Sequence, residues 1–293
     1  MTTIPVDVSS ADLPQVDMTK MCDFLHCHRY FFWRYERNVV AIQPKASLVY
    51  GIAIHAMLAE WHKTGSYRSA MIAFDKSWQK HGEPEGDQKR NPIRAAEMMN
   101  AYRQYYPYEK DKEQFRVIDT EVRGALPAGN FMLVVIIDLV ADYYRYGLRP
   151  MDHKTTSYLN DSWWVGSNIK HQYSAYLWAM RKLFGKNCNS LEINGLLVDK
   201  TRCQFERKPT SRSDWELDDW QRQMNHVWKE VELCKAENEW PENDDYCTRW
   251  GGRSDMICQF HSLCTTVGVD YRELEPPKSQ FKVEKWDPLN EVR

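Results

Sequence analysis

The chain has 293 residues, of which 43% are hydrophobic, and its formal net charge is −2. This is enough apolar material for the core of one large domain or of two small ones. No run of about 18 apolar residues occurs, which excludes a simple membrane span, and the near-neutral charge by itself gives no support to a nucleic-acid-binding protein.

The first twenty residues, MTTIPVDVSSADLPQVDMTK, show no basic stretch followed by an apolar one, so they do not resemble a signal peptide. We therefore expect a cytoplasmic protein. In that compartment the eight cysteines are expected to be thiols, metal ligands or cluster ligands rather than disulfides.

The first third of the chain has the apolar spacing of helices, interrupted by Pro44. The elements expected there are an irregular lead-in at 1–18, an aromatic-rich helix at 20–37, and helices at 46–62, 66–79 and 93–105.

The pattern then changes to strands that alternate with helices. The elements expected there are strands at 115–126, 131–144 and 148–155, a helix at 166–184, a strand at 191–202, a helix at 215–236 and an irregular tail from residue 238. This order predicts an α/β fold in a single domain at 19–293. Its parts are a helical region at 19–110, an α/β core at 111–205 and a helix with a cysteine-bearing cap at 206–293.

The segment MDHKT ends the third expected strand. Alternate residues of a strand point to the same side, so Asp152 and Lys154 should project together while His153 points away. A carboxylate can hold Mg²⁺ or Mn²⁺, and a nearby ammonium can orient a water molecule and offset phosphate charge. An exposed, charged strand end is the alternative.

Asp138 interrupts the apolar run VVIIDLV, which has the pattern of a fully buried strand. A buried carboxylate needs a cation, a metal or several hydrogen-bond donors. A short turn between the two strands would bring Asp138 near Asp152, where one divalent ion would satisfy both. A structural ion pair is the alternative.

Two pairs of residues are spaced four apart on expected helices, so each pair shares a helix face. Gly51 removes side-chain bulk beside His55, which either binds a metal or is a core histidine. Gln172 and Tyr176 either contact DNA phosphate or position Lys154, or they belong to an ordinary polar stripe.

Basic residues gather in two segments, His28–Arg37 and Lys200–Arg212, each with aromatic neighbours. Basic groups bind phosphates, and aromatic rings stack on unpaired bases. Solvated charges that flank core aromatics explain the same pattern.

Taken in order, G-x-x-x-H, D, D-x-K and Q-x-x-x-Y resemble the RecB-like branch of the PD-(D/E)XK nucleases. The resemblance implies a restriction-endonuclease-like core with a mixed central sheet flanked by helices. It also implies that His55, Asp138, Asp152 and the carbonyl group of His153 hold Mg²⁺ or Mn²⁺, and that Lys154 is catalytic. Gln172 and Tyr176 would complete the catalytic set.

Two further positions bear on this resemblance. Glu121 matches an acidic position that the family often has on the preceding strand. Val135 stands where the family usually has glycine, three residues before the middle aspartate.

The segment CHRYFFWRY, from Cys27, resembles the C-P-R-x-F-x-x-x-Y opening of iron–sulfur members of this group, such as the AddB-type subunit and the CRISPR-associated exonucleases. Those proteins have three more cysteines near the C-terminus, which here would be Cys247, Cys258 and Cys264. The resemblance implies a [4Fe–4S] cluster on these four thiols, and Zn²⁺ would use the same four. The loop WGGRSD would absorb the long spacing after Cys247. Unrelated free cysteines remain the alternative.

The resemblance implies a metal-dependent deoxyribonuclease. It favours an exonuclease that acts on DNA ends or single strands over an endonuclease. Such enzymes act in phage recombination, in DNA repair and in CRISPR systems. A non-catalytic nucleic-acid-binding protein, or a zinc-stabilised adaptor on the same fold, is the alternative. The chain has no G-x-x-x-x-G-K-[ST] phosphate loop, so unwinding would need a helicase or recombination partner.

Overall fold

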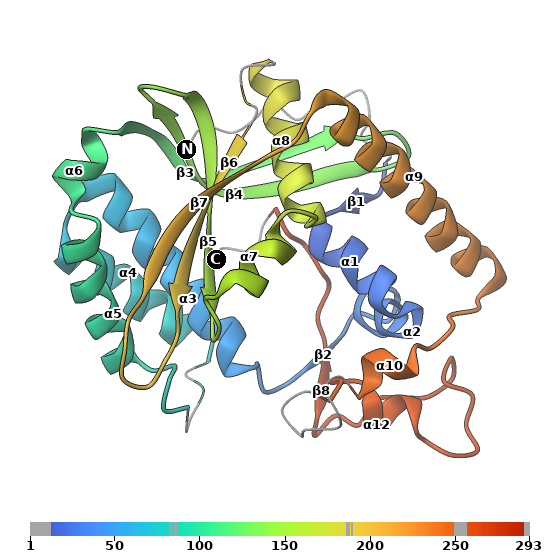
Figure 1. The fold of residues 1–293 in the computed structure, drawn as a ribbon. Helices are drawn as coiled ribbons and strands as arrows, with labels where there is room; N and C mark the ends of the chain where they lie inside the picture. Colours follow the sequence, from blue (N-terminus) through green and yellow to red (C-terminus); the bar gives the residue numbers. More distant parts are fainter. Residues whose placement is uncertain are drawn as a thin grey trace.

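The computed structural model describes residues 13–82, 84, 87–185, 188, 190–248 and 257–289. In this part of the chain a mixed six-stranded sheet forms the centre, and helices cover both of its faces (Figure 1). The expected α/β fold, with a mixed sheet between helices, is confirmed. The strands of the sheet are β1 (Gln15–Val16), β3 (Phe115–Pro127), β4 (Met132–Tyr143), β5 (Gly147–Thr156), β6 (Ser190–Leu197) and β7 (Phe205–Ser211).

The central strand is β4, and nearly all of its residues are buried, as its continuous apolar run predicts. Along one edge it pairs antiparallel with β3. Along the other edge β1 pairs with Met132 and Leu133, whereas β5 pairs antiparallel only from Leu139 to Tyr143. Asp138 therefore lies where β4 and β5 separate. The sheet continues through β6, parallel to β5, and β7, antiparallel to β6.

The helices form two apolar cores on opposite faces of the sheet. On one face α3 (Ala46–Thr64), α4 (Tyr67–Lys80) and α5 (Pro92–Tyr105) pack against Leu196 of β6. On the other face α1 (Met18–His26), α8 (His171–Phe184) and α9 (Asp214–Glu237) pack against Ile193. These two β6 residues differ by an odd number, so their side chains point to opposite faces.

The two ends of the described chain meet in a small second sheet, in which β2 (Val39–Ala41) pairs antiparallel with β8 (Phe281–Val283). None of the described helices is long and apolar enough to cross a membrane. The remaining elements are α2 (His28–Phe31), a π-helical turn (Phe32–Glu36), α6 (Tyr108–Lys112), α7 (Asp161–Ser167), α10 (Asp244–Cys247) and α12 (His261–Cys264).

The structure differs from the expected elements at several points. β1 lies within the expected irregular lead-in, β2, α6 and β8 were not predicted, and the strand expected at 191–202 ends at Leu197. The helix expected at 20–37 is interrupted at Cys27, whose backbone is extended. The helix expected at 166–184 is two helices, α7 and α8, because Lys170 has extended backbone angles and caps α8. The strand β7 was not predicted, because its sequence FERKPTS has charged residues and Pro209 in place of an alternating apolar pattern.

Candidate active site

His55 and Asp138 form the centre of the site. His55 lies on α3, and its Nδ1 atom is 3.0 Å from Oδ1 of Asp138 on β4. The other carboxylate oxygen accepts a hydrogen bond of 2.7 Å from the backbone N–H of His153 on β5. Asp138 is buried, and these two contacts offset the free-energy cost of burying its charge.

The two side chains set each other's charge. Burial alone would raise the pKa of Asp138, but His55, together with His153 and Lys154, holds that pKa below its ordinary value. Burial alone would lower the pKa of His55, but the Asp138 carboxylate raises it above its ordinary value. The pair thus favours an imidazolium beside a carboxylate. A metal ion bound at the imidazole would take over that positive charge and release a proton.

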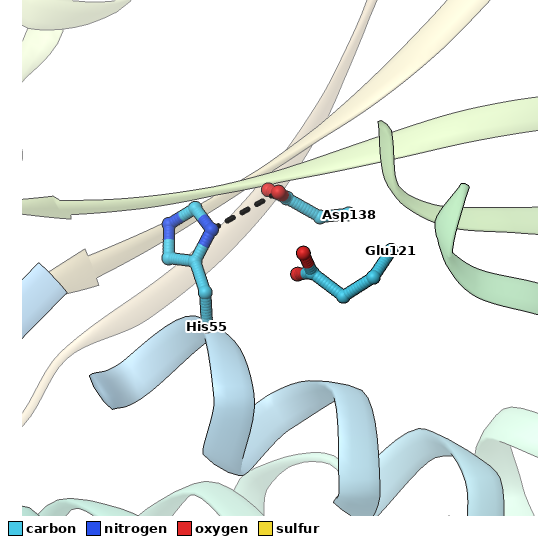
Figure 2. Close-up of side chains that lie close together, drawn as sticks. All are labelled: His55, Glu121 and Asp138. Carbon is cyan, nitrogen blue, oxygen red and sulfur yellow. Dashed lines mark hydrogen bonds and ion pairs between the residues drawn. The ribbon is translucent and has the colours of Figure 1, made fainter. Parts of the chain in front are cut away.

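Glu121 of β3 is the third member of the group and points toward His55 and Asp138 (Figure 2). The residue pairs immediately before and after Glu121 place it directly opposite Asp138 on the neighbouring strand β4. One nitrogen of the histidine and one oxygen of each carboxylate all lie within 4.8 Å of one another. Among the described histidine, cysteine, aspartate and glutamate residues, this is the only group of three or more whose ligand atoms all lie within 4.8 Å of one another.

Asp152 and Lys154 lie beside the trio and contact each other. Lys154 Nζ is 2.9 Å from Asp152 Oδ1, so the two side chains project together, as the strand pattern predicts. Asp152 is fully buried, and burial raises its pKa; Lys154 lowers that pKa and Asp138 raises it again, and the net shift is upward. A cation bound near Asp152 would therefore favour its ionised form.

His153 points away from this pair into a buried polar network. Its Nδ1 is 2.9 Å from Asn194 Nδ2 on β6, and the same amide donates to the hydroxyl of Tyr102 at 2.9 Å. Arg207 of β7 also donates to that hydroxyl, at 2.8 Å, and pairs with Asp111 at 2.7 and 2.9 Å. Burial lowers the pKa of His153 to about 3, so its ring is a neutral hydrogen-bond acceptor in this network. The sequence pattern predicted only that His153 points away from Asp152 and Lys154. It did not indicate that the other residues of this network meet His153.

Gln172 and Tyr176 lie on one face of α8, as their spacing predicts, and hydrogen-bond to each other. Gln172 Nε2 donates to the Tyr176 hydroxyl at 2.9 Å, and that hydroxyl donates to the carbonyl oxygen of Ile136 at 2.7 Å. Ile136 lies two residues before Asp138 on β4. These bonds tie α8 to the strand that carries Asp138.

Arginines of both basic segments make structural contacts. Arg29 donates to the carbonyl oxygen of Trp240 at 2.7 Å, and Arg37 donates to that of Arg272 at 2.7 Å. Arg207, in the second segment, is in the buried pair described above. For these three arginines the structural explanation of the basic segments applies.

The four expected cluster ligands come from both ends of the chain. Cys27 separates α1 from α2, and the N–H of Cys258 donates to the carbonyl oxygen of Cys247 at 3.1 Å. Burial is the main cause that raises the pKa of Cys258 to about 11 and that of Cys264 to about 12, and nearby Cys27 and Cys247 contribute to both shifts. The thiols thus lie near enough to influence one another. The loop WGGRSD lies outside the described residues.

A mixed sheet between helices, with a half-buried histidine and two carboxylates beside an Asp–Lys pair, defines an α/β protein with a candidate metal centre. Residues 17–265 match the model of the PD-(D/E)XK nuclease superfamily, and the chain belongs to that superfamily. No curated protein matches the sequence.

The fold is similar to that of a solved structure from Eubacterium rectale, assigned there as an exonuclease. The TM-score is 0.54 at 14% identity, over 83% of this chain and 91% of that one. A second solved structure, LHK-Exo in complex with dAMP, matches with a TM-score of 0.29 at 14% identity, over 66% of this chain and 96% of that one.

Proposed function

We propose that this chain is a divalent-metal-dependent deoxyribonuclease that hydrolyses phosphodiester bonds at DNA ends or in single strands. The observation that carries the proposal is the trio of His55, Glu121 and Asp138, which lies beside the Asp152–Lys154 pair. Superfamily membership supports a nuclease.

The side chains fit Mg²⁺ or Mn²⁺. Carboxylate oxygens are the ligands that Mg²⁺ prefers, and an imidazole nitrogen is compatible with Mn²⁺. We assign His55, Asp138, Asp152 and the carbonyl group of His153 as the ligands, as the resemblance implies, and add Glu121 because it lies within the trio. When bound, the ion would offset the charge of the scissile phosphate and lower the pKa of a water molecule.

The protein's own groups have separate tasks. Lys154 keeps 24% of its side chain exposed, so its ammonium can contact the phosphate and orient the attacking water. Asp152 fixes Lys154 by the 2.9 Å contact. The backbone N–H of His153 fixes the direction of the Asp138 carboxylate, and Tyr176 with Gln172 fixes β4 two residues earlier. The proposed products carry a 5′-phosphate and a 3′-hydroxyl group.

Exonuclease action is preferred because the motifs resemble those of end-processing enzymes. The similar structure from Eubacterium rectale is itself assigned as an exonuclease. We also propose a helicase or recombination partner as the source of the single strand.

We also propose that Cys27, Cys247, Cys258 and Cys264 bind a [4Fe–4S] cluster. The raised pKa values of Cys258 and Cys264 mean that these thiols stay neutral until a metal makes them thiolates. A tetrahedral Zn²⁺ site on the same four thiols is the alternative.

The test is degradation of end-labelled single- and double-stranded DNA with Mg²⁺ or Mn²⁺. We expect the wild type to cut, and Lys154→Ala and Asp152→Ala to lose at least about 100-fold in rate while they stay folded by circular dichroism. Lys182→Ala, at the far end of α8, is the matched control and should cut normally. A wild type that is inert on every DNA form with either metal would leave a non-catalytic nucleic-acid-binding protein as the better explanation.

A further inference from the structure

A tryptophan lies one strand away from the proposed catalytic lysine. Lys154 of β5 pairs with Gly195 of β6. A β-carbon on Gly195 would come within 3.3 Å of the Trp163 ring and 2.7 Å of Leu159. The missing side chain at Gly195 thus lets the Trp163 ring lie over β6, one strand away from Lys154.

The ring is fixed but only partly covered. The Asn160 side chain caps α7 by accepting a hydrogen bond from the backbone N–H of Trp163, at 3.1 Å. Trp164 packs edge-on against the ring, with the centroids 4.6 Å apart. Val165 of α7 is 68% exposed and Ile169, just after the end of α7, is 82% exposed, so this segment carries exposed apolar side chains.

Lys170 supplies positive charge at the same place. Its Nζ atom is 5.6 Å from the centroid of the Trp163 ring. Burial lowers the pKa of Lys170, Lys154 lowers it further, and Asp152 opposes them. Two ammonium groups thus influence each other beside one half-buried aromatic ring. An anion between them would relieve their repulsion.

We propose that Trp163 and Lys170 form a nucleotide-binding subsite next to the cleavage site, with single-stranded DNA as its ligand. Trp163 stacks on the base, and Lys170 binds the phosphate that flanks the scissile one. Stacking needs an open base face, which an unpaired nucleotide offers and a base inside a duplex does not. The inference rests on the proposed function, because it takes Lys154 to mark the cleavage site.

The experiment measures binding of a fluorescein-labelled oligothymidine strand, and of a labelled duplex, with Ca²⁺ in place of the catalytic ion. Trp163→Leu keeps apolar packing over Gly195 but removes the aromatic face, and we expect it to weaken single-strand binding about 5- to 100-fold. Trp163→Phe should restore most of that affinity, and duplex binding should change little in either variant. The matched control is Trp215→Ala, a 68% exposed tryptophan at the start of α9.

The phosphate contact has a separate readout. Lys170→Gln should reduce the slope of log affinity against log salt by about 0.7 on single strands, the value for one lost phosphate contact. Lys182→Gln, at the other end of α8, should leave the slope unchanged.

The outcomes separate the two proposals. A wild type that neither cuts nor binds any DNA contradicts the proposed function. A wild type that cuts, together with a Trp163→Leu variant that binds single strands as tightly as the wild type, contradicts the subsite alone. Equal losses on single strands and duplex would also overturn it, because they would show a general packing role.

Discussion

Glu121 is the residue whose conformation most clearly departs from ordinary strand geometry. Its φ angle is 52°, in the left-handed region. The other described non-glycine residues with positive φ are Asn38 and Asn238, and asparagine tolerates this region better than glutamate. A strained glutamate persists only where its surroundings hold it, and here it points toward His55 and Asp138.

We expect Glu121→Gly to stabilise the metal-free protein by about 1 kcal/mol, because glycine adopts positive φ without strain. The same variant should bind Mn²⁺ at least about 10-fold more weakly, because it removes a carboxylate from the trio. Urea denaturation and titration calorimetry with Mn²⁺ measure the two effects.

Glu121→Gln is the matched control for this prediction. It keeps the backbone strain and removes the charge, so it should lose Mn²⁺ affinity without the gain in stability. Unchanged Mn²⁺ binding in both variants would show that Glu121 is not a ligand.

At the residue scale, the apolar run around Asp138 predicted that this buried carboxylate needs a partner, and only the family resemblance put His55 in the same site as Asp138; the structure places the two side chains 3.0 Å apart. It indicated Glu121 only through the family resemblance. A positive φ at glutamate leaves no mark in composition or periodicity, so the direction of that side chain could not be read beforehand.

At the scale of elements, one buried network connects α5, α6, β5, β6 and β7 behind the site. The Tyr102 hydroxyl accepts hydrogen bonds from Asn194 and Arg207, and Asn194 holds the ring of His153. The network therefore supports the part of β5 that supplies the N–H to Asp138.

We expect Tyr102→Phe to destabilise the protein by about 2–6 kcal/mol, because one N–H of Asn194 and one of Arg207 each lose a buried acceptor, at about 1–3 kcal/mol each. It should also raise the Mn²⁺ concentration needed for half-maximal binding, because β5 is less firmly held. Chemical denaturation and Mn²⁺ titration followed by electron paramagnetic resonance test both effects.

Tyr50→Phe is the control. Tyr50 lies in the same layer of helices, and its buried hydroxyl has no hydrogen-bond partner among the described residues. It should change stability by less than about 1 kcal/mol. Equal effects of the two variants would argue against a role for the network.

The same network explains which elements the sequence could predict. The apolar run of β4 and the long amphipathic α9 were predicted to within one or two residues, because burial alone sets their pattern. The strand β7 was missed because Arg207 is buried through its pair with Asp111, 96 positions away. Local periodicity does not encode a partner at that distance.

At the scale of the whole molecule, the N-terminal helices and the C-terminal tail form one unit beside the α/β core (Figure 1). Arg29 donates to the carbonyl oxygen of Trp240 at 2.7 Å, and its guanidinium carbon lies 3.3 Å from the centroid of the Tyr271 ring. The side chain of Asn243 donates to the carbonyl oxygen of His26 at 2.8 Å. The strands β2 and β8 extend the same contact.

A cluster on Cys27, Cys247, Cys258 and Cys264 would join these two ends by metal–sulfur bonds. Metal sites that join distant segments contribute their binding free energy to folding, so loss of the cluster should loosen this unit before the core. The opening of the tail would leave the trio on α3, β3 and β4 intact, because none of those elements belongs to the unit.

We therefore expect Cys27→Ser to lose the iron of anaerobically purified protein and to speed hydrogen exchange in α2, α12 and β8, while β3, β4 and β5 stay protected. Cys22→Ser, on α1 and five residues before Cys27, is the matched control. It should keep both the iron and the slow hydrogen exchange. Iron analysis and exchange measured by mass spectrometry give the answer together. Iron that persists in Cys27→Ser would contradict the assignment of this ligand. Zinc in place of iron in the wild type would mean that the same four thiols join the two ends through the other metal.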